Sequence, residues 1–106
     1  MQLSVTGRHI EITDSMKKYA EDKAGKLTRY YDRVETIDVV LDHESLRFKV
    51  ELVVRADHKH TFVAQTDAGD FYEAVDLVSK KMERQLTEHK ERFRNRKHRA
   101  AEEQTP

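Results

Sequence analysis

The sequence contains no cysteine and very little glycine or proline, and these shortages exclude several kinds of protein. Without Cys there can be no disulfide framework, no thiolate nucleophile and no cysteine-based zinc site. Only three Gly and one Pro occur among 106 residues, and charged and hydrophobic residues make up 38% and 37% of the chain. This composition is typical of one well-structured, soluble domain rather than of a disordered chain.

Long apolar runs and phosphate-binding or nucleophile motifs are also missing. No stretch approaches the roughly 18 consecutive apolar residues of a membrane-spanning helix, and the opening MQLSVTGRH lacks the layout of a signal peptide. We therefore expect a cytosolic protein. The sequence contains no P-loop, no G-x-G-x-x-G and no G-x-S-x-G motif. We therefore predict a protein that is not an enzyme and that binds no cofactor.

What the sequence does contain is a clear succession of hydrophobic periods. Alternation of polar and apolar residues predicts strands over 2–6, 37–42, 48–54 and 61–65, with turns at Gly7, 43–46, 56–59 and 66–69. Apolar spacings of three and four predict one helix from 13–15 to Tyr31 and a second from Asp70 to about Arg99. Gly25 inside the first helix indicates either close packing against a neighbour or an early end.

The order of these elements, β-α-β-β-β-α, predicts an α+β fold. The strand-helix-strand crossover makes the first two strands parallel, and the short later links make the others antiparallel. Both helical stripes can then cover one face of a four-stranded mixed sheet, which gives a two-layer sandwich. We predict one domain over 1–99 and a disordered tail over 100–106. The chain shows neither an extension beyond its basic end nor an obvious exposed apolar strand, so we expect a monomer.

Charge is unevenly distributed along this chain of zero net charge. Residues 80–99 contain nine Lys or Arg and three Glu, a net charge of +6, whereas residues 1–79 contain eleven basic and fifteen acidic residues, a net charge of −4. A solvated amphipathic helix could show such a run of charge. Confinement of the basic excess to one end favours a nucleic-acid-binding surface instead.

Two smaller groups of residues are weaker candidates for chemistry. Asp57, His58 and His60 could ligate a metal, but an H-x-H pattern without further ligands nearby favours a turn, so we predict no metal site. Asp38 and Asp42 share the outward face of one strand, where no cleft is implied for acid–base catalysis. We predict no catalytic residue.

Several segments resemble a known family. MQLSVTGRHIEIT, KLTRYYDRV, and DFYEAVD followed by MERQLTEHK are similar to the short ribosome hibernation-promoting factors and ribosome-associated inhibitor A, the sigma-54 modulation protein family. The resemblance covers about residues 1–93. It implies a fold like that of double-stranded-RNA-binding domains, and binding to small-subunit ribosomal RNA in the channel used by messenger and transfer RNA. The bacterial ribosome would then be held inactive.

The resemblance also suggests which residues bind RNA. Asp70, Tyr72 and Asp76 match the family's entry to the second helix. The expected RNA-binding residues are Lys23, Lys26, Lys80, Lys81, Arg84, Lys90, Arg92 and Arg94. The resemblance itself matches Lys23, Lys26, Lys81, Arg84 and Lys90. Lys80 belongs to the basic run of residues 80–99, and Arg92 and Arg94, together with Arg8, are added on charge alone. Two alternatives remain open: a general module for double-stranded RNA, and a domain that binds a protein or small molecule through its sheet.

Overall fold

The elements follow one another in the predicted order β-α-β-β-β-α, with a short 3₁₀ helix after the first α-helix. The computed structural model describes the backbone of residues 1–103 and the side chains of residues 1–94. The elements are β1 (Gln2–Arg8), α1 (Asp14–Gly25), the 3₁₀ helix η1 (Lys26–Arg29), β2 (Val34–Glu44), β3 (Arg47–Ala56), β4 (His60–Ala68) and α2 (Phe71–Glu103).

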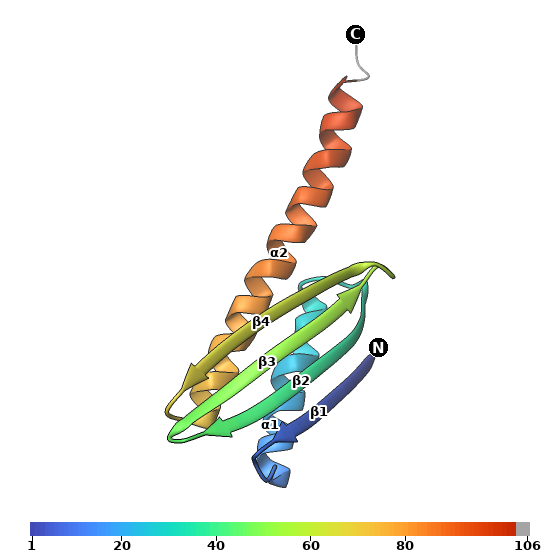
Figure 1. The fold of residues 1–106 in the computed structure, drawn as a ribbon. Coiled ribbons are helices and arrows are strands. Elements are labelled where there is room, and N and C mark those ends of the chain that lie inside the picture. Colours follow the sequence, from blue (N-terminus) through green and yellow to red (C-terminus); the bar gives the residue numbers. More distant parts are fainter. Residues whose placement is uncertain (104–106) are drawn as a thin grey trace.

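The four strands form one mixed sheet in the order β1-β2-β3-β4 (Figure 1). β1 is parallel to β2, and the β2–β3 and β3–β4 pairs are antiparallel. Both helices lie on the same face of the sheet, with α1 serving as the crossover between the parallel strands (Figure 1). The predicted α+β two-layer sandwich is therefore confirmed.

The core lies between the sheet and the helices. Each strand turns alternate apolar residues inward, as the period of two requires, and α2 buries the predicted stripe. The largest fully buried side chains are Leu27, Ile37, Val39, Leu41, Val50, Leu52, Val54, Val78, Met82 and Leu86. Burying each such side chain favours folding by about 1.5–3 kcal/mol, so this layer of contacts fixes where α2 lies on the sheet.

The predicted helix starts are confirmed by hydrogen bonds. The Thr13 hydroxyl accepts from the Met16 amide at 3.1 Å, and the Asp70 carboxylate accepts from the Glu73 amide at 3.0 Å. The α-helical geometry of α1 ends at Gly25, where no neighbouring atom lies within 4 Å of the position that a Cβ would occupy. Of the two explanations for this glycine, the early end of the helix is the correct one.

Several boundaries differ from the expectations. β1 continues through Gly7 to Arg8 instead of turning there, and this glycine is needed because a Cβ would lie 2.9 Å from the Ile12 side chain. The loop expected at 43–46 consists of residues 45–46 alone, and β4 extends to Ala68. Cross-strand pairing extended these strands beyond the residues that alternate in hydrophobicity.

α2 is far longer than the sheet that it covers. It spans 33 residues, whereas β4 spans nine, and its C-terminal half projects beyond the sheet (Figure 1). The molecule measures 61 × 24 × 19 Å along its principal axes. The helix includes residues 100–103, which the sequence analysis assigned to a tail; residues 104–106 of that predicted tail lie outside the described part. No helix in the described residues has the length and apolarity needed to cross a membrane.

Candidate nucleic-acid interface

Most of the basic side chains of α2 lie on the parts of its surface that do not face the sheet. Because the apolar stripe recurs every three or four residues, the positions between its members point to solvent. Six of the residues predicted to bind RNA are exposed on α2, and all of them except Lys81, which reaches the edge of the sheet, lie on this part of its surface: Lys80, Lys81, Arg84, Lys90, Arg92 and Arg94. The helix therefore presents cations along most of the length over which its side chains are described.

The two predicted lysines Lys23 and Lys80 are brought together where α1 crosses α2. The Lys23 ammonium lies 3.4 Å from the Asp76 carboxylate and 5.7 Å from the centre of the Tyr19 ring. Tyr19 donates a 2.6 Å hydrogen bond to Asp76, and this bond, followed by Lys23 and Lys80, lowers the pKa of the Asp76 carboxyl. The same bond and burial raise the pKa of Tyr19 to about 12. Asp76 thus pairs with Lys23 of α1, and Lys80 follows Asp76 one turn later on α2.

Neighbouring residues extend this junction between the helices. Tyr72 is exposed, and its ring contacts the Tyr19 ring edge to face at a centroid distance of 4.8 Å. Lys26 is exposed at the first position of η1, immediately after α1 ends. The two lysines of this segment of the chain, Lys23 and Lys26, therefore lie in the same layer as the basic face of α2.

Lys81 and Arg8 belong to a different surface. The Lys81 ammonium donates to the backbone carbonyl of Gln65 at 3.1 Å, at the edge of β4. Arg8 and Lys81 then line one shallow hollow on the open face of the sheet, beside Asp42 and Asp67. The structure therefore divides the predicted cations into a helix-layer group and a pair at the sheet.

Further along α2, Glu88 interrupts the basic surface. Its carboxylate lies 3.7 Å from Arg84 and 3.9 Å from Arg92, one turn to either side. All three side chains are exposed, and such surface pairs contribute only about 0.3–0.5 kcal/mol each. Either arginine can therefore exchange this carboxylate for a phosphate at little cost.

The open face of the sheet, by contrast, has no basic excess. The outward charged residues of its strands are four basic and five acidic, a net charge of −1, and Lys81 of α2, which lines the hollow on this face, brings the balance to zero; the strand residues are Arg8, Asp38, Asp42, Glu44, Arg47, Lys49, Glu51, Arg55 and Asp67. Ser4 donates to Asp38 at 2.6 Å, and His9 lies 3.2 Å from Asp42, so the two carboxylates that the sequence singled out have separate partners. The two faces of the sandwich thus differ in charge.

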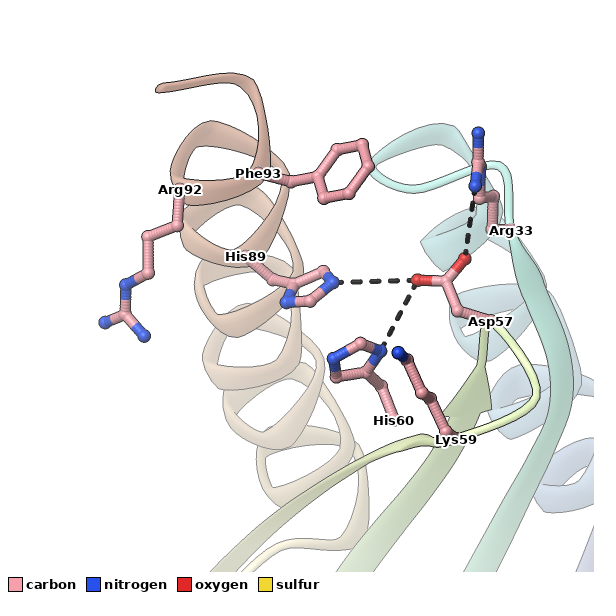
Figure 2. Close-up of a pocket in the computed structure, with 7 residues that line it drawn as sticks. All are labelled: Arg33, Asp57, Lys59, His60, His89, Arg92 and Phe93. Atoms are coloured by element: carbon pink, nitrogen blue, oxygen red, sulfur yellow. Dashed lines mark ion pairs between the residues drawn. The ribbon is translucent and has the colours of Figure 1, made fainter. Parts of the chain in front are cut away.

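A second cluster lies near the point where α2 leaves the sheet. Asp57, from the turn between β3 and β4, and His60, the first residue of β4, meet His89 of α2 in a cavity of about 450 Å³ (Figure 2). The expected turn is confirmed, and Asp57 and His58 both adopt positive φ there. His58 points elsewhere and pairs with Glu35 at 3.0 Å.

His89 is the residue that the sequence analysis left out of this cluster. The H-x-H pattern pointed to the correct turn, but it included His58 in the cluster. In the structure His58 lies elsewhere, and His89 is the second histidine of the cluster. His89 is separated from His60 by the whole of β4 and half of α2, so no local pattern links the two. Its place on the α2 stripe, three residues after Leu86, was the one available signal that it faces inward.

Comparison with known proteins gives a consistent result. The family model described as Sigma 54 modulation protein / S30EA ribosomal protein matches residues 3–94. A ribosome hibernation promoting factor of Azotobacter vinelandii is 34% identical over 92 residues, which cover 87% of this chain and 85% of that protein. A ribosomal subunit interface protein from Coxiella burnetii has a similar structure, with a TM-score of 0.78, 27% identity and coverage of 85% and 98%. The N-terminal domain of Thermus thermophilus Protein Y is also similar, with a TM-score of 0.75, 28% identity and coverage of 84% and 99%.

Proposed function

We propose that this chain is a ribosome hibernation factor that binds the small ribosomal subunit. The basis is that the chain belongs to the Sigma 54 modulation protein / S30EA ribosomal protein family. Binding would take place in the cytoplasm, through ribosomal RNA. The match to the family model covers nearly all of the residues whose side chains are described, so the proposal concerns the whole folded domain.

The observation that carries this proposal is the separation of charge between the two faces of the sandwich. The helix layer presents Lys23, Lys26 and the exposed cations of α2, whereas the open sheet face has no basic excess. Phosphate contacts supply most of the affinity of proteins for nucleic acid, and they require cations that face the same way. The helix layer is therefore the surface that we assign to RNA.

The proposed mode of action is occupation of a site rather than catalysis. A narrow molecule of 61 × 24 × 19 Å with cations along one helix suits an RNA-lined channel. Bound in the channel used by messenger and transfer RNA, it would exclude both ligands sterically and stabilise the inactive ribosome. Under this proposal no bond is made or broken, and inhibition is reversed when the factor dissociates.

The test is binding of the full chain to purified small subunits, measured by sedimentation over a range of salt concentrations. About six phosphate contacts give a slope of about −5 in log K against log salt. Replacing Lys80 and Arg84 with Gln should weaken binding and make that slope shallower by about two units. Both side chains are exposed, so we expect the melting temperature to be unchanged.

The matched control is Lys49→Gln with Arg55→Gln, on the open sheet face. This pair removes the same two charges from exposed positions, so it should leave small-subunit binding unchanged if the helix layer makes the contacts. Equal weakening by both pairs would show that only net charge matters. Equally tight binding to an arbitrary RNA duplex would favour a general double-stranded-RNA module, and a flat salt response would favour a protein-binding domain.

A further inference from the structure

Three side chains of metal-ligating type converge beneath the overhanging part of α2. His60 Nδ1 lies 3.6 Å from Asp57 Oδ2, and His89 Nε2 lies 3.7 Å from the same oxygen. One ligand atom from each of the three residues lies within 4.8 Å of the others. Figure 2 shows both imidazole rings directed at the carboxylate, His60 from the start of β4 and His89 from α2.

These atoms approach one another without forming hydrogen bonds. His60 Nδ1 and His89 Nε2 are buried, and neither has a hydrogen-bond partner among the described residues; the same is true of Asp57 Oδ1. The two distances to Asp57 Oδ2 exceed the usual 2.7–3.2 Å range for N–H···O bonds. Buried polar atoms are normally satisfied, so a cluster of three such atoms requires an explanation.

The separations fit a bound metal ion. Bonds of about 2.0–2.1 Å in a tetrahedral zinc site place the ligand atoms about 3.4 Å apart. The two separations of 3.6 and 3.7 Å need only small side-chain adjustments to reach that value, and the ligand atoms of His60 and His89, within 4.8 Å of each other, would move closer together around the ion. Two imidazole nitrogens and one carboxylate oxygen are a donor set that suits zinc and leaves a fourth position for solvent.

The surrounding structure holds the carboxylate in place. The Tyr31 hydroxyl donates to Asp57 Oδ2, and the Asp57 amide donates to the Arg33 carbonyl at 3.2 Å. The His89 ring packs edge to face against the Tyr31 and Phe62 rings at 5.2 and 5.1 Å. Such outer contacts orient metal ligands and limit the rearrangement that binding requires.

Nearby cations set a limit on the affinity. The Arg33 guanidinium lies 3.9 Å from Asp57 Oδ1, and Lys59 and Arg92 line the same cavity. Their positive charge opposes a divalent ion, although Arg33 is exposed and contacts the other carboxylate oxygen. We therefore expect moderate affinity, in the micromolar range.

We propose that Asp57, His60 and His89 form a binding site for zinc or a similar transition-metal ion, which ties the β3–β4 turn to α2. The bound ion would fix the helix at the point where it leaves the sheet, and so would fix the direction of the projecting basic half. This inference does not depend on the proposed ribosome binding, because the ligands are separate from the cations assigned to RNA.

The test is metal binding by the full chain after treatment with a chelator. Zn²⁺ should bind in a 1:1 ratio in competition with a chromophoric chelator, and Co²⁺ should give the visible absorption of a four-coordinate site. Zn²⁺ should raise the melting temperature, whereas Mg²⁺, which prefers oxygen ligands, should not. His60→Gln and His89→Gln should each weaken Zn²⁺ binding at least tenfold and abolish the thermal shift.

The matched control is His58→Gln, which changes the other histidine of the H-x-H pattern. Its side chain is 92% exposed and faces Glu35, so Zn²⁺ affinity should stay unchanged. Equal loss of affinity in His58→Gln and His60→Gln would overturn the proposal, as would wild-type chain that binds no Zn²⁺ at millimolar concentration. If His89→Gln does not fold, His60→Gln decides, because its more exposed position at the start of β4 tolerates the change.

Discussion

Gly7 and Gly25 occupy sites with opposite steric demands, and they provide a test at the level of single residues. Gly25 has φ −61° and ψ −28°, which any residue adopts, and it has open space where a Cβ would lie. Gly25→Ala should therefore raise the free energy of unfolding by about 0.5–1 kcal/mol, because it restricts the unfolded chain. Urea denaturation at constant m-value measures this change.

Gly7→Ala is the counterpart in the same assay. Its new Cβ would lie 2.9 Å from the Ile12 side chain, so the strand or the isoleucine must shift, and we expect destabilisation. A stabilised Gly7→Ala variant would contradict the close packing described for β1.

The Tyr19–Asp76 hydrogen bond should contribute a pH-dependent part of the stability. The lowered pKa of Asp76 means that this contribution is present above the ordinary carboxyl value of 3.8 and is lost as the pH falls through the lowered value. Tyr19 ionises near pH 12 instead of 10, so the contribution is lost again as the pH rises from 10 to 12.

Tyr19→Phe should therefore lower the free energy of unfolding by about 1 kcal/mol near neutral pH. This value is small for a hydrogen bond to a charged group, because Asp76 is partly exposed to solvent. The difference from wild type should shrink at both extremes of pH. Tyr30→Phe, at an exposed phenol, should remain within about 0.5 kcal/mol at every pH. A difference for Tyr19→Phe that is constant with pH would contradict the pairing.

At the scale of secondary-structure elements, the sequence predicted what depends on local periodicity. The stripe from Phe71 to Leu86 and the four alternating segments each carry their own evidence of which face is buried. The length of β1 depends instead on Ile12 packing over Gly7, and the approach of His89 to His60 depends on how α2 crosses the sheet. Those features arise from tertiary contacts, so no window of the sequence contains them. The predicted cations are on the surface as expected, but the sequence did not indicate that Lys81 contacts the sheet edge.

The two halves of α2 should separate stability from binding. Removing residues 94–106 deletes four basic and two acidic residues, while the buried stripe ends at Leu86. We expect the shortened chain to melt within a few degrees of the full chain, to bind small subunits more weakly, and to show a salt slope shallower by about one unit for each lost phosphate contact. A large fall in melting temperature with unchanged affinity would show that this segment is structural.

At the scale of the whole molecule, we predict a monomer in free solution. The described part of the chain measures 61 × 24 × 19 Å, and large apolar residues on its surface are scattered, such as Leu46 and Val63. Analytical ultracentrifugation should give a single species whose mass does not change with concentration and whose frictional ratio exceeds that of a sphere. A dimer that persists on dilution would contradict this expectation.

The hydrogen bonds that α2 makes to β4 bear on how the protein behaves when it is concentrated. Lys81 donates to the Gln65 carbonyl and Gln85 donates to the Val63 carbonyl, two acceptors in the middle of the edge strand β4 that an added strand would otherwise use. Fibres that grow by edge-to-edge strand addition require that both edge strands of every molecule be available for pairing. With the β4 edge protected in this way, a second molecule could add a strand only at the β1 edge. Two molecules could then pair, but no third molecule could join them. The helix that we assign to RNA thus also protects the protein against polymerisation at the sheet edge.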